Sequence, residues 1–129
     1  MTGVLLDTHA WAWSIYATNR LSTVARQAVT GADVIMVSPV SLFEIGQKVR
    51  AGKWPEVEPI LDRLPEILRD QGAFPATLTP EICLAASTMA WPHRDPFDRI
   101  IAATAEILGL ALVTRDAVFA TRPGLRTIW

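Results

Sequence analysis

Short, unbroken apolar runs that alternate with helix signals are the feature that most constrains the fold of this sequence. Residues 3–6, 34–37 and 111–114 form such runs. Strands that are buried on both faces of a parallel sheet read as continuous apolar runs, because neither face is left for polar side chains. Strands that alternate with helices are typical of α/β folds. We therefore predict an α/β sandwich with a mostly parallel central sheet.

Helix starts are marked by capping side chains, three of which stand directly before a proline: Ser38-Pro39, Thr79-Pro80 and Asp95-Pro96. Proline suits the first helical turn, because the N–H group that it lacks would have no partner there. Caps and glycine stops together predict helices over 8–16, 23–30, 39–51, 80–90 and 96–108. The other expected elements are a proline-broken helical segment over 54–71 and short strands at 76–78 and 126–128.

The length of 129 residues predicts one compact core, and we expect a single domain over residues 1–129. Half of the residues are hydrophobic, which excludes a disordered chain and leaves apolar surface for a partner, so we expect a homodimer. The net charge of −1 lacks the basic excess of a protein that coats nucleic acid, so any such contact must be local.

The compartment is predicted from cysteine usage and hydropathy. The single cysteine, Cys83, has no partner for an internal disulfide, and the N-terminus lacks the pattern of a signal peptide. The longest apolar stretch, residues 100–113, contains Glu106 and Gly109 and is shorter than the roughly 20 residues that span a bilayer. We expect a cytoplasmic protein without a membrane segment.

Four candidate acids lie after predicted strands or in predicted helices. Asp7 and Asp116 follow strands, Glu44 lies in the helix after the second strand, and Asp98 lies in the first turn of the long helix. Because parallel strands end at one edge of a sheet, and sites of α/β folds lie at that edge, we expect these side chains to converge. Each also has a structural interpretation. Asp7 suits a helix cap and Asp116 a turn, while Lys48 stands four residues after Glu44, the spacing of a surface ion pair.

Asp98 carries the strongest physical argument. In its helix it lies on the apolar stripe with Ile101 and Ala105, whereas Arg99 and Glu106 mark the solvent side. Its structural interpretation is a favourable interaction with the helix N-terminus. However, a carboxylate on a buried stripe needs a strong partner, because unpaired burial costs several kcal/mol.

Gathered carboxylates repel one another, so such a site is stable at neutral pH when a divalent cation lies among them. Oxygen ligands favour Mg²⁺ or Mn²⁺ over zinc, and an ion of this kind suits phosphodiester hydrolysis. Two alternatives stay open. A phosphatase of the haloacid-dehalogenase type also has an aspartate after its first strand, but needs a second acid where this chain has His9. An acidic-pocket regulatory module would bind Mg²⁺ without cutting.

The segments LLDTHAWAW, VSLFEIGQK, HRDPFDRIIAATA and LVTRD resemble the PIN-domain family, and within it the VapC-like toxins with an HRDPFDR segment. The resemblance covers residues 4 to about 119. It implies a three-layer α/β/α fold and a Mg²⁺- or Mn²⁺-dependent endoribonuclease that acts as the toxin of a toxin–antitoxin pair and is silenced by a small antitoxin. A PIN fold kept for binding alone is a further alternative, against which the complete acid set argues.

The resemblance also assigns roles to residues. It makes Asp7 and Asp98 the principal metal ligands, with Glu44 and Asp116 completing the shell. Neighbouring polar residues suggest a second shell of Thr8, Asp95 and Thr114, and an RNA-binding rim of Arg94, Arg99, Arg115 and Lys48. Each of these seven residues also has a plain structural interpretation, as a strand-end threonine, a helix cap or a solvated charge.

Overall fold

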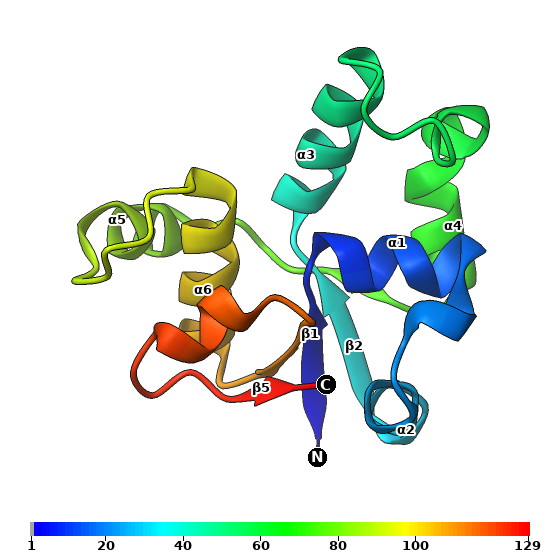
Figure 1. The fold of residues 1–129 in the computed structure, drawn as a ribbon. Helices are drawn as coiled ribbons and strands as arrows, with labels where there is room; N and C mark the ends of the chain where they lie inside the picture. The colour runs from blue at the N-terminus through cyan, green and yellow to red at the C-terminus, as the bar shows by residue number, and fades with distance from the viewer. Residues whose placement is uncertain (1) are drawn as a thin grey trace.

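The computed structural model describes residues 2–129, which form a central sheet with helices packed around it (Figure 1). The strands are β1 (Gly3–Leu6), β2 (Val34–Val37), β3 (Phe74–Pro75), β4 (Ala111–Val113) and β5 (Thr127–Ile128). The α-helices are α1 (Thr8–Tyr16), α2 (Thr23–Gly31), α3 (Pro39–Arg50), α4 (Leu64–Asp70), α5 (Pro80–Thr88) and α6 (Pro96–Leu108). Short 3₁₀ helices are η1 (Thr18–Arg20), η2 (Glu58–Arg63) and η3 (Ala117–Thr121).

The sheet has the order β3-β2-β1-β4-β5, and all its neighbouring strands are parallel. The prediction of a mostly parallel sheet is therefore confirmed. The chain builds β2 and β3 on one side of β1 and then crosses to build β4 and β5 on the other. Leu6 lies beside both Val37 and Val113, so β1, β2 and β4 end level with one another. Side chains that follow these strands are brought to one edge.

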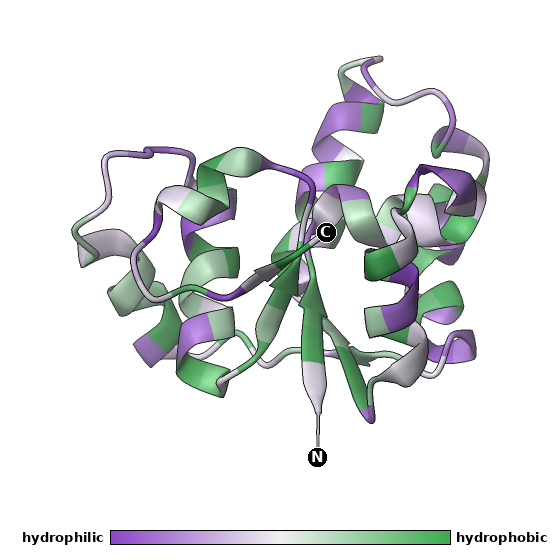
Figure 2. Cartoon of the chain, turned by 60° about the horizontal axis from the view of Figure 1, so that its bottom comes forward, coloured by the Kyte–Doolittle hydropathy of each residue, from purple (hydrophilic) through white to green (hydrophobic). Residues whose placement is uncertain are grey.

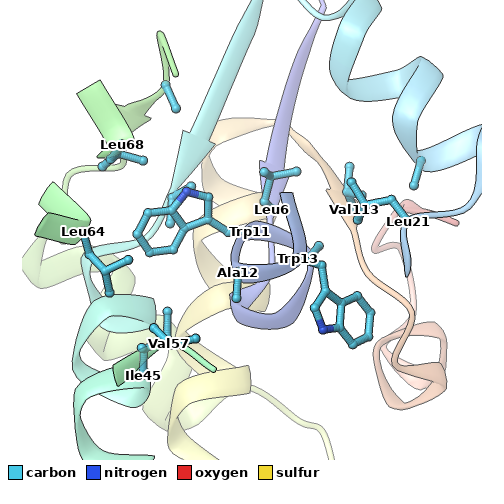
Figure 3. Packing of buried hydrophobic residues seen from close by; sticks show 14 of the residues in the cluster. Leu6, Trp11, Ala12, Trp13, Leu21, Ile45, Val57, Leu64, Leu68 and Val113 are labelled. Carbon is cyan, nitrogen blue, oxygen red and sulfur yellow. The ribbon is translucent and has the colours of Figure 1, made fainter. Parts of the chain in front are cut away.

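Strand residues alternate between the two faces of the sheet and so create two cores. Leu6 and Val113 pack with Trp11 of α1 and with residues of α3 and α4 (Figure 3). Leu5 and Leu112 point the other way and pack against Ile101 of α6. Because both faces are covered, the strands are apolar along most of their length (Figure 2). The result is the three-layer α/β/α arrangement.

All three helices predicted from a cap followed by proline are present. The Ser38 hydroxyl accepts from the Val40 N–H at 3.2 Å and the Thr79 hydroxyl from the Ile82 N–H at 3.1 Å. Helix α6 ends at Gly109, which has a φ of 66°. Glycine is favoured at this position because other side chains rarely adopt the left-handed conformation.

The strand predicted over residues 76–78 is wrong in its position. Strand β3 lies two residues earlier and pairs Phe74 with Met36 and Pro75 with Val37. The N–H of Ala76 still donates to the Val37 carbonyl at 2.8 Å, but β2 ends there and Pro39 starts a helix. Residues 77–78 therefore have no strand beside them. Within residues 2–129, no helix is long and apolar enough to cross a membrane.

Candidate active site: an acidic cavity at the edge of the sheet

A cavity of about 590 Å³ opens at the edge of the sheet where β1 and β4 end. Figure 1 shows α3 and α6 on either side of this end of β1. All four acids predicted for the site line the cavity, joined by the predicted second-shell acid; the five are Asp7, Glu44, Asp95, Asp98 and Asp116. Two cations, Lys48 and Arg115, also line it. Elements far apart in the sequence thus bring five carboxyl groups to one opening.

Asp7 is the most enclosed of these acids, with only 6% of its surface exposed. It caps α1, which is one of its two predicted roles. Its Oδ1 accepts from the Ala10 N–H at 2.8 Å. Oδ2 accepts from the Thr114 hydroxyl at 2.5 Å. Burial raises the pKa of Asp7 to about 6, and the nearby charges of Asp98 and Asp116 also raise it. Cap and site residue are therefore compatible roles for one side chain.

The sequence predicts that Asp98 needs a strong partner but does not identify it; in the structure the partner is His93. Asp98 Oδ2 lies 2.6 Å from Nε2 of His93, and the Asp98 side chain is 20% exposed. The fully buried Ile101 lies one turn further along α6, so Asp98 does continue the apolar stripe. Burial raises the pKa of Asp98 to about 6, against the opposing hydrogen bond from His93. Nearby Asp95 and Glu44 raise this pKa further.

Glu44 combines a buried position with an ion pair. Its Oε1 accepts from the Thr8 hydroxyl at 2.6 Å, and this hydroxyl lies 3.0 Å from that of Ser41. Its Oε2 lies 3.3 Å from Lys48 Nζ, the pair predicted from their spacing. Glu44 is only 8% exposed, however, so the pair belongs to the cavity wall and is not a freely solvated surface contact.

Asp116 and Asp95 are both caps that also face the cavity. Asp116 is exposed and accepts from the Val118 N–H at 3.0 Å, which starts η3. Its own N–H donates to the Thr114 hydroxyl at 3.0 Å, so that Thr114 links Asp116 to Asp7. Asp95 accepts from the Asp98 N–H at 2.9 Å and starts α6. Thr8 and Thr114, predicted for a second shell, each donate to a carboxylate of the cavity.

The predicted RNA rim is only partly assembled at this cavity. Lys48 and Arg115 line it, whereas Arg94 is exposed outside its lining. Arg99 requires a correction, because its guanidinium does not face solvent. It donates to four carbonyl groups of the end of α5 and the following loop, at 2.6–2.9 Å: those of Ala86, Met89, Trp91 and His93. Through these bonds Arg99 holds the loop in place, so we do not assign it an RNA contact.

Four aromatic residues of the site were not predicted for it: His93, His9, Trp13 and Phe119. His93 contacts Asp98, while His9 and Trp13 line the cavity with their rings 5.6 Å apart. Burial lowers the pKa of His9, and the charge of Lys48 lowers it further. His93 stands five residues before Asp98, across a loop, where helical periodicity carries no signal. Trp13 has helical spacing from His9, but its apolar surroundings favoured a core role.

The donor set fits a divalent cation that is bound partly through water. In residues 2–129, no three acidic, histidine or cysteine side chains lie close enough to hold one ion by themselves. Mg²⁺ typically uses one or two carboxylates and keeps several waters, so it does not need such a cage. Burial is the main cause of the raised pKa values of Asp7 and Asp98, and neighbouring carboxylates add to it; a cation would offset both effects.

Comparisons with known proteins agree with this fold. Residues 4–125 match the family model of the PIN domain. The ribonuclease VapC22 of Mycobacterium tuberculosis is 36% identical over 119 residues, which cover 90% of this chain and 88% of that protein. A chain of a toxin–antitoxin complex from Klebsiella pneumoniae is similar in structure, with a TM-score of 0.62, 19% identity and coverage of 95% and 94% of the two chains.

A second solved structure, of FitAcB from Neisseria gonorrhoeae, has a TM-score of 0.54 to this chain at 20% identity, with 96% of this chain and 95% of that chain covered. At these identities the two solved structures show a shared fold. The match to the family model spans the segments that carry Asp7, Glu44, Asp98 and Asp116.

Proposed function

The chain belongs to the PIN-domain family, and on that premise we propose that it is a metal-dependent endoribonuclease that hydrolyses RNA phosphodiesters. The observation that carries the proposal is the cavity in which five carboxyl groups meet, two of them with a pKa raised to about 6. Nothing in a folded core requires such a concentration of like charge. A site that binds a cation and a phosphate does.

We assign Asp7 and Asp98 to hold the cation, because they line the cavity at the end of β1 and the start of α6 and are the two acids whose pKa burial raises to about 6. Glu44 and Asp116, which also line the cavity, would complete the ligand shell directly or through water. Mg²⁺ and Mn²⁺ suit these oxygen donors. When bound, the cation polarises the phosphate and lowers the pKa of an adjacent water.

The remaining polar residues of the site keep the carboxylates in place. Thr114 holds Asp7 and the backbone of Asp116 through one hydroxyl, so the two acids move together. His93 holds Asp98, and Thr8 holds Glu44. Such hydrogen bonds to ligands orient their lone pairs and exclude rotamers that face away from the cavity. Of the two cations in the lining, Arg115 is the one without a carboxylate partner, and we assign it to the phosphate.

RNA is proposed as the substrate because a relative that is 36% identical over most of the chain is a ribonuclease. The fold shared with a chain of a toxin–antitoxin complex supports a further step, namely that this chain is the toxin of such a pair and binds a small antitoxin. A short reading frame immediately upstream, and growth arrest that its co-expression relieves, are the expected observations for this partner.

The substrate is tested by incubating the purified chain with Mg²⁺ and total RNA, and in parallel with DNA of the same sequence as one cleaved RNA. We expect discrete RNA ends, no DNA cleavage and full loss of cutting in EDTA. RNA that stays intact with either Mg²⁺ or Mn²⁺, while metal binds, would favour the regulatory-module alternative. Release of phosphate from monoesters without cleavage of RNA would favour the phosphatase.

A further inference from the structure

A second cavity, of about 400 Å³, adjoins the acidic one and shares His9, Trp13 and Lys48 with it. Its walls come from α1, η1, the end of α3 and the turn after α3. We call it the aromatic-basic cavity, because its lining consists mostly of rings and cations: the three shared residues together with Tyr16, Trp54, Arg20 and Lys53.

The rings of this cavity form a fixed platform with one accessible member. His9 is exposed and stacks on Trp54, with ring centroids 4.7 Å apart and an angle of 25° between the planes. Trp54 is only 5% exposed, and its Nε1 donates to the Tyr16 hydroxyl at 3.0 Å. The buried Trp54 ring, held by its hydrogen bond to Tyr16, therefore fixes the position of the His9 ring. His9 presents an aromatic surface to solvent.

The cations are positioned by the same rings. The Arg20 guanidinium carbon lies 5.7 Å from the centroid of Trp13, and Lys48 Nζ lies 5.5 Å from that of Trp54. Lys53 is exposed at the same opening. Only one acid, Glu56, lines this cavity, whereas five line its neighbour. The sign of the charge thus changes from negative to positive across the shared wall.

An acidic centre repels the RNA backbone, so the affinity for RNA must come from surfaces beside it. Proteins bind unpaired nucleotides by stacking bases on aromatic rings and by placing cations along the backbone. We propose that the aromatic-basic cavity binds an unpaired nucleotide that flanks the scissile phosphate, with its base on His9 and its phosphates on Arg20 and Lys53. This inference rests on the proposed ribonuclease function.

The test measures binding and cleavage separately. Binding is followed by the anisotropy of a fluorescein-labelled RNA of about ten nucleotides, cut from a substrate whose cleaved bond has been mapped, in buffer without divalent cations. We expect His9→Ala to weaken binding by about fivefold or more, and His9→Phe, which keeps a flat ring, to stay within about twofold of wild type. In a set of RNAs that each lack one base, we expect one RNA to which His9→Ala and wild type bind with equal affinity.

The charges are tested with Arg20→Gln and Lys53→Gln, and with Arg69→Gln as a control, because Arg69 is an equally exposed cation at the end of α4. We expect each of the first two to weaken binding by about threefold and the control to have no effect. Wild-type RNA cleavage together with unchanged affinity in His9→Ala, Arg20→Gln and Lys53→Gln would overturn the subsite and leave the nuclease intact. Failure of wild type to cut any RNA would instead overturn the function on which the subsite rests.

Discussion

The two carboxyl groups with a raised pKa, Asp7 and Asp98, are held in different ways. Asp7 is fixed from its own helix and from Thr114, whereas Asp98 depends on His93, a side chain of the preceding loop. The sequence predicts both acids, since one follows a strand and the other lies on an apolar stripe. It does not predict His93, because loop residues reach their partners through the path of the backbone and not through a periodic pattern.

The raised pKa of Asp98 predicts a cost to stability in the metal-free protein. The folded-state pKa is about 6 against an ordinary 3.8, so the folded state binds more protons between these values. The free energy of unfolding therefore falls as pH rises through this window. Asp98→Asn should raise it by about 1 kcal/mol at pH 7.5, after allowance for solvent screening, and by almost nothing at pH 3.5.

Urea unfolding at the two pH values measures this effect. The same measurement is repeated with added Mg²⁺. Mg²⁺ should raise the free energy of unfolding of wild type at pH 7.5 and leave that of Asp98→Asn unchanged, because an ion stabilises only a folded protein that binds it. A stability of Asp98→Asn below that of wild type at pH 7.5 without metal would contradict the predicted cost of the partly buried Asp98 charge.

Thr114 connects two acids, so its hydroxyl should matter more than its methyl group. Thr114→Val keeps the shape but removes the bonds to Asp7 and to the Asp116 backbone, and we expect cleavage to fall by about tenfold to 100-fold. Thr114→Ser should retain most of the activity. The single-turnover cleavage rates of the two variants test this prediction. Equal rates for Thr114→Val and Thr114→Ser would exclude a positioning role of the hydroxyl.

At the scale of elements, helix starts were predicted more accurately than strands. Caps such as Ser38 and Asp95 act on N–H groups two or three residues away, so their signal is local. A strand instead requires a neighbour, and the segment 76–78 lost its neighbour when β2 ended. Arg99 is a second case in which a local pattern is not sufficient. Its position on the helix predicts exposure to solvent, but the loop after α5 covers its side chain.

Arg99 is predicted to be a main support of the connection between α5 and α6. Its guanidinium satisfies four carbonyl groups, which a lysine cannot do because it lacks the planar set of donors. Both Arg99→Lys and Arg99→Met should lower the free energy of unfolding by about 2 kcal/mol or more. The control is Arg126→Met, which removes a single exposed bond to Gly109 and should change it by less than about 0.5 kcal/mol. Similar small losses in all three variants would contradict this role.

The cap role of Asp95 can be separated from its charge. Asparagine caps a helix as well as aspartate does, so Asp95→Asn should keep wild-type stability, whereas Asp95→Ala should lose about 1 kcal/mol. If Asp95 also binds a metal-coordinated water, Asp95→Asn will weaken Mg²⁺ binding, which calorimetry measures. We expect a loss of affinity smaller than about tenfold, since Asp7 and Asp98 carry the main contacts.

At the scale of the whole molecule, the parallel sheet places the site. Chain segments near residues 7, 44, 98 and 116 converge only because β1, β2 and β4 run in one direction, which the unbroken apolar runs predicted. The aromatic-basic cavity could not be predicted in the same way. It depends on the turn after α3, which brings Trp54 back onto His9, and no local pattern fixes that path.

The small number of cations that line the two cavities predicts a moderate dependence of RNA binding on salt. If Arg20, Lys53 and Arg115 are the cations that meet phosphates, binding releases the counterions of about three phosphates of the RNA. The slope of log K against log salt concentration should then be about −2 to −3 for single-stranded RNA. Anisotropy titrations over a range of salt give this slope, and a value far steeper would require a basic surface elsewhere on the molecule.

The most direct test of the account is the single-turnover rate of RNA cleavage by wild type, Asp98→Asn and Asp62→Asn as Mg²⁺ is raised. Asp62 is an exposed acid of η2, outside the cavity, and serves as the matched control. We predict that wild type and Asp62→Asn reach the same rate and that Asp98→Asn is slower by at least about 100-fold at saturating Mg²⁺. Cleavage by Asp98→Asn at the wild-type rate, or cleavage that continues in EDTA, would contradict the assignment of the acidic cavity as a metal-dependent active site.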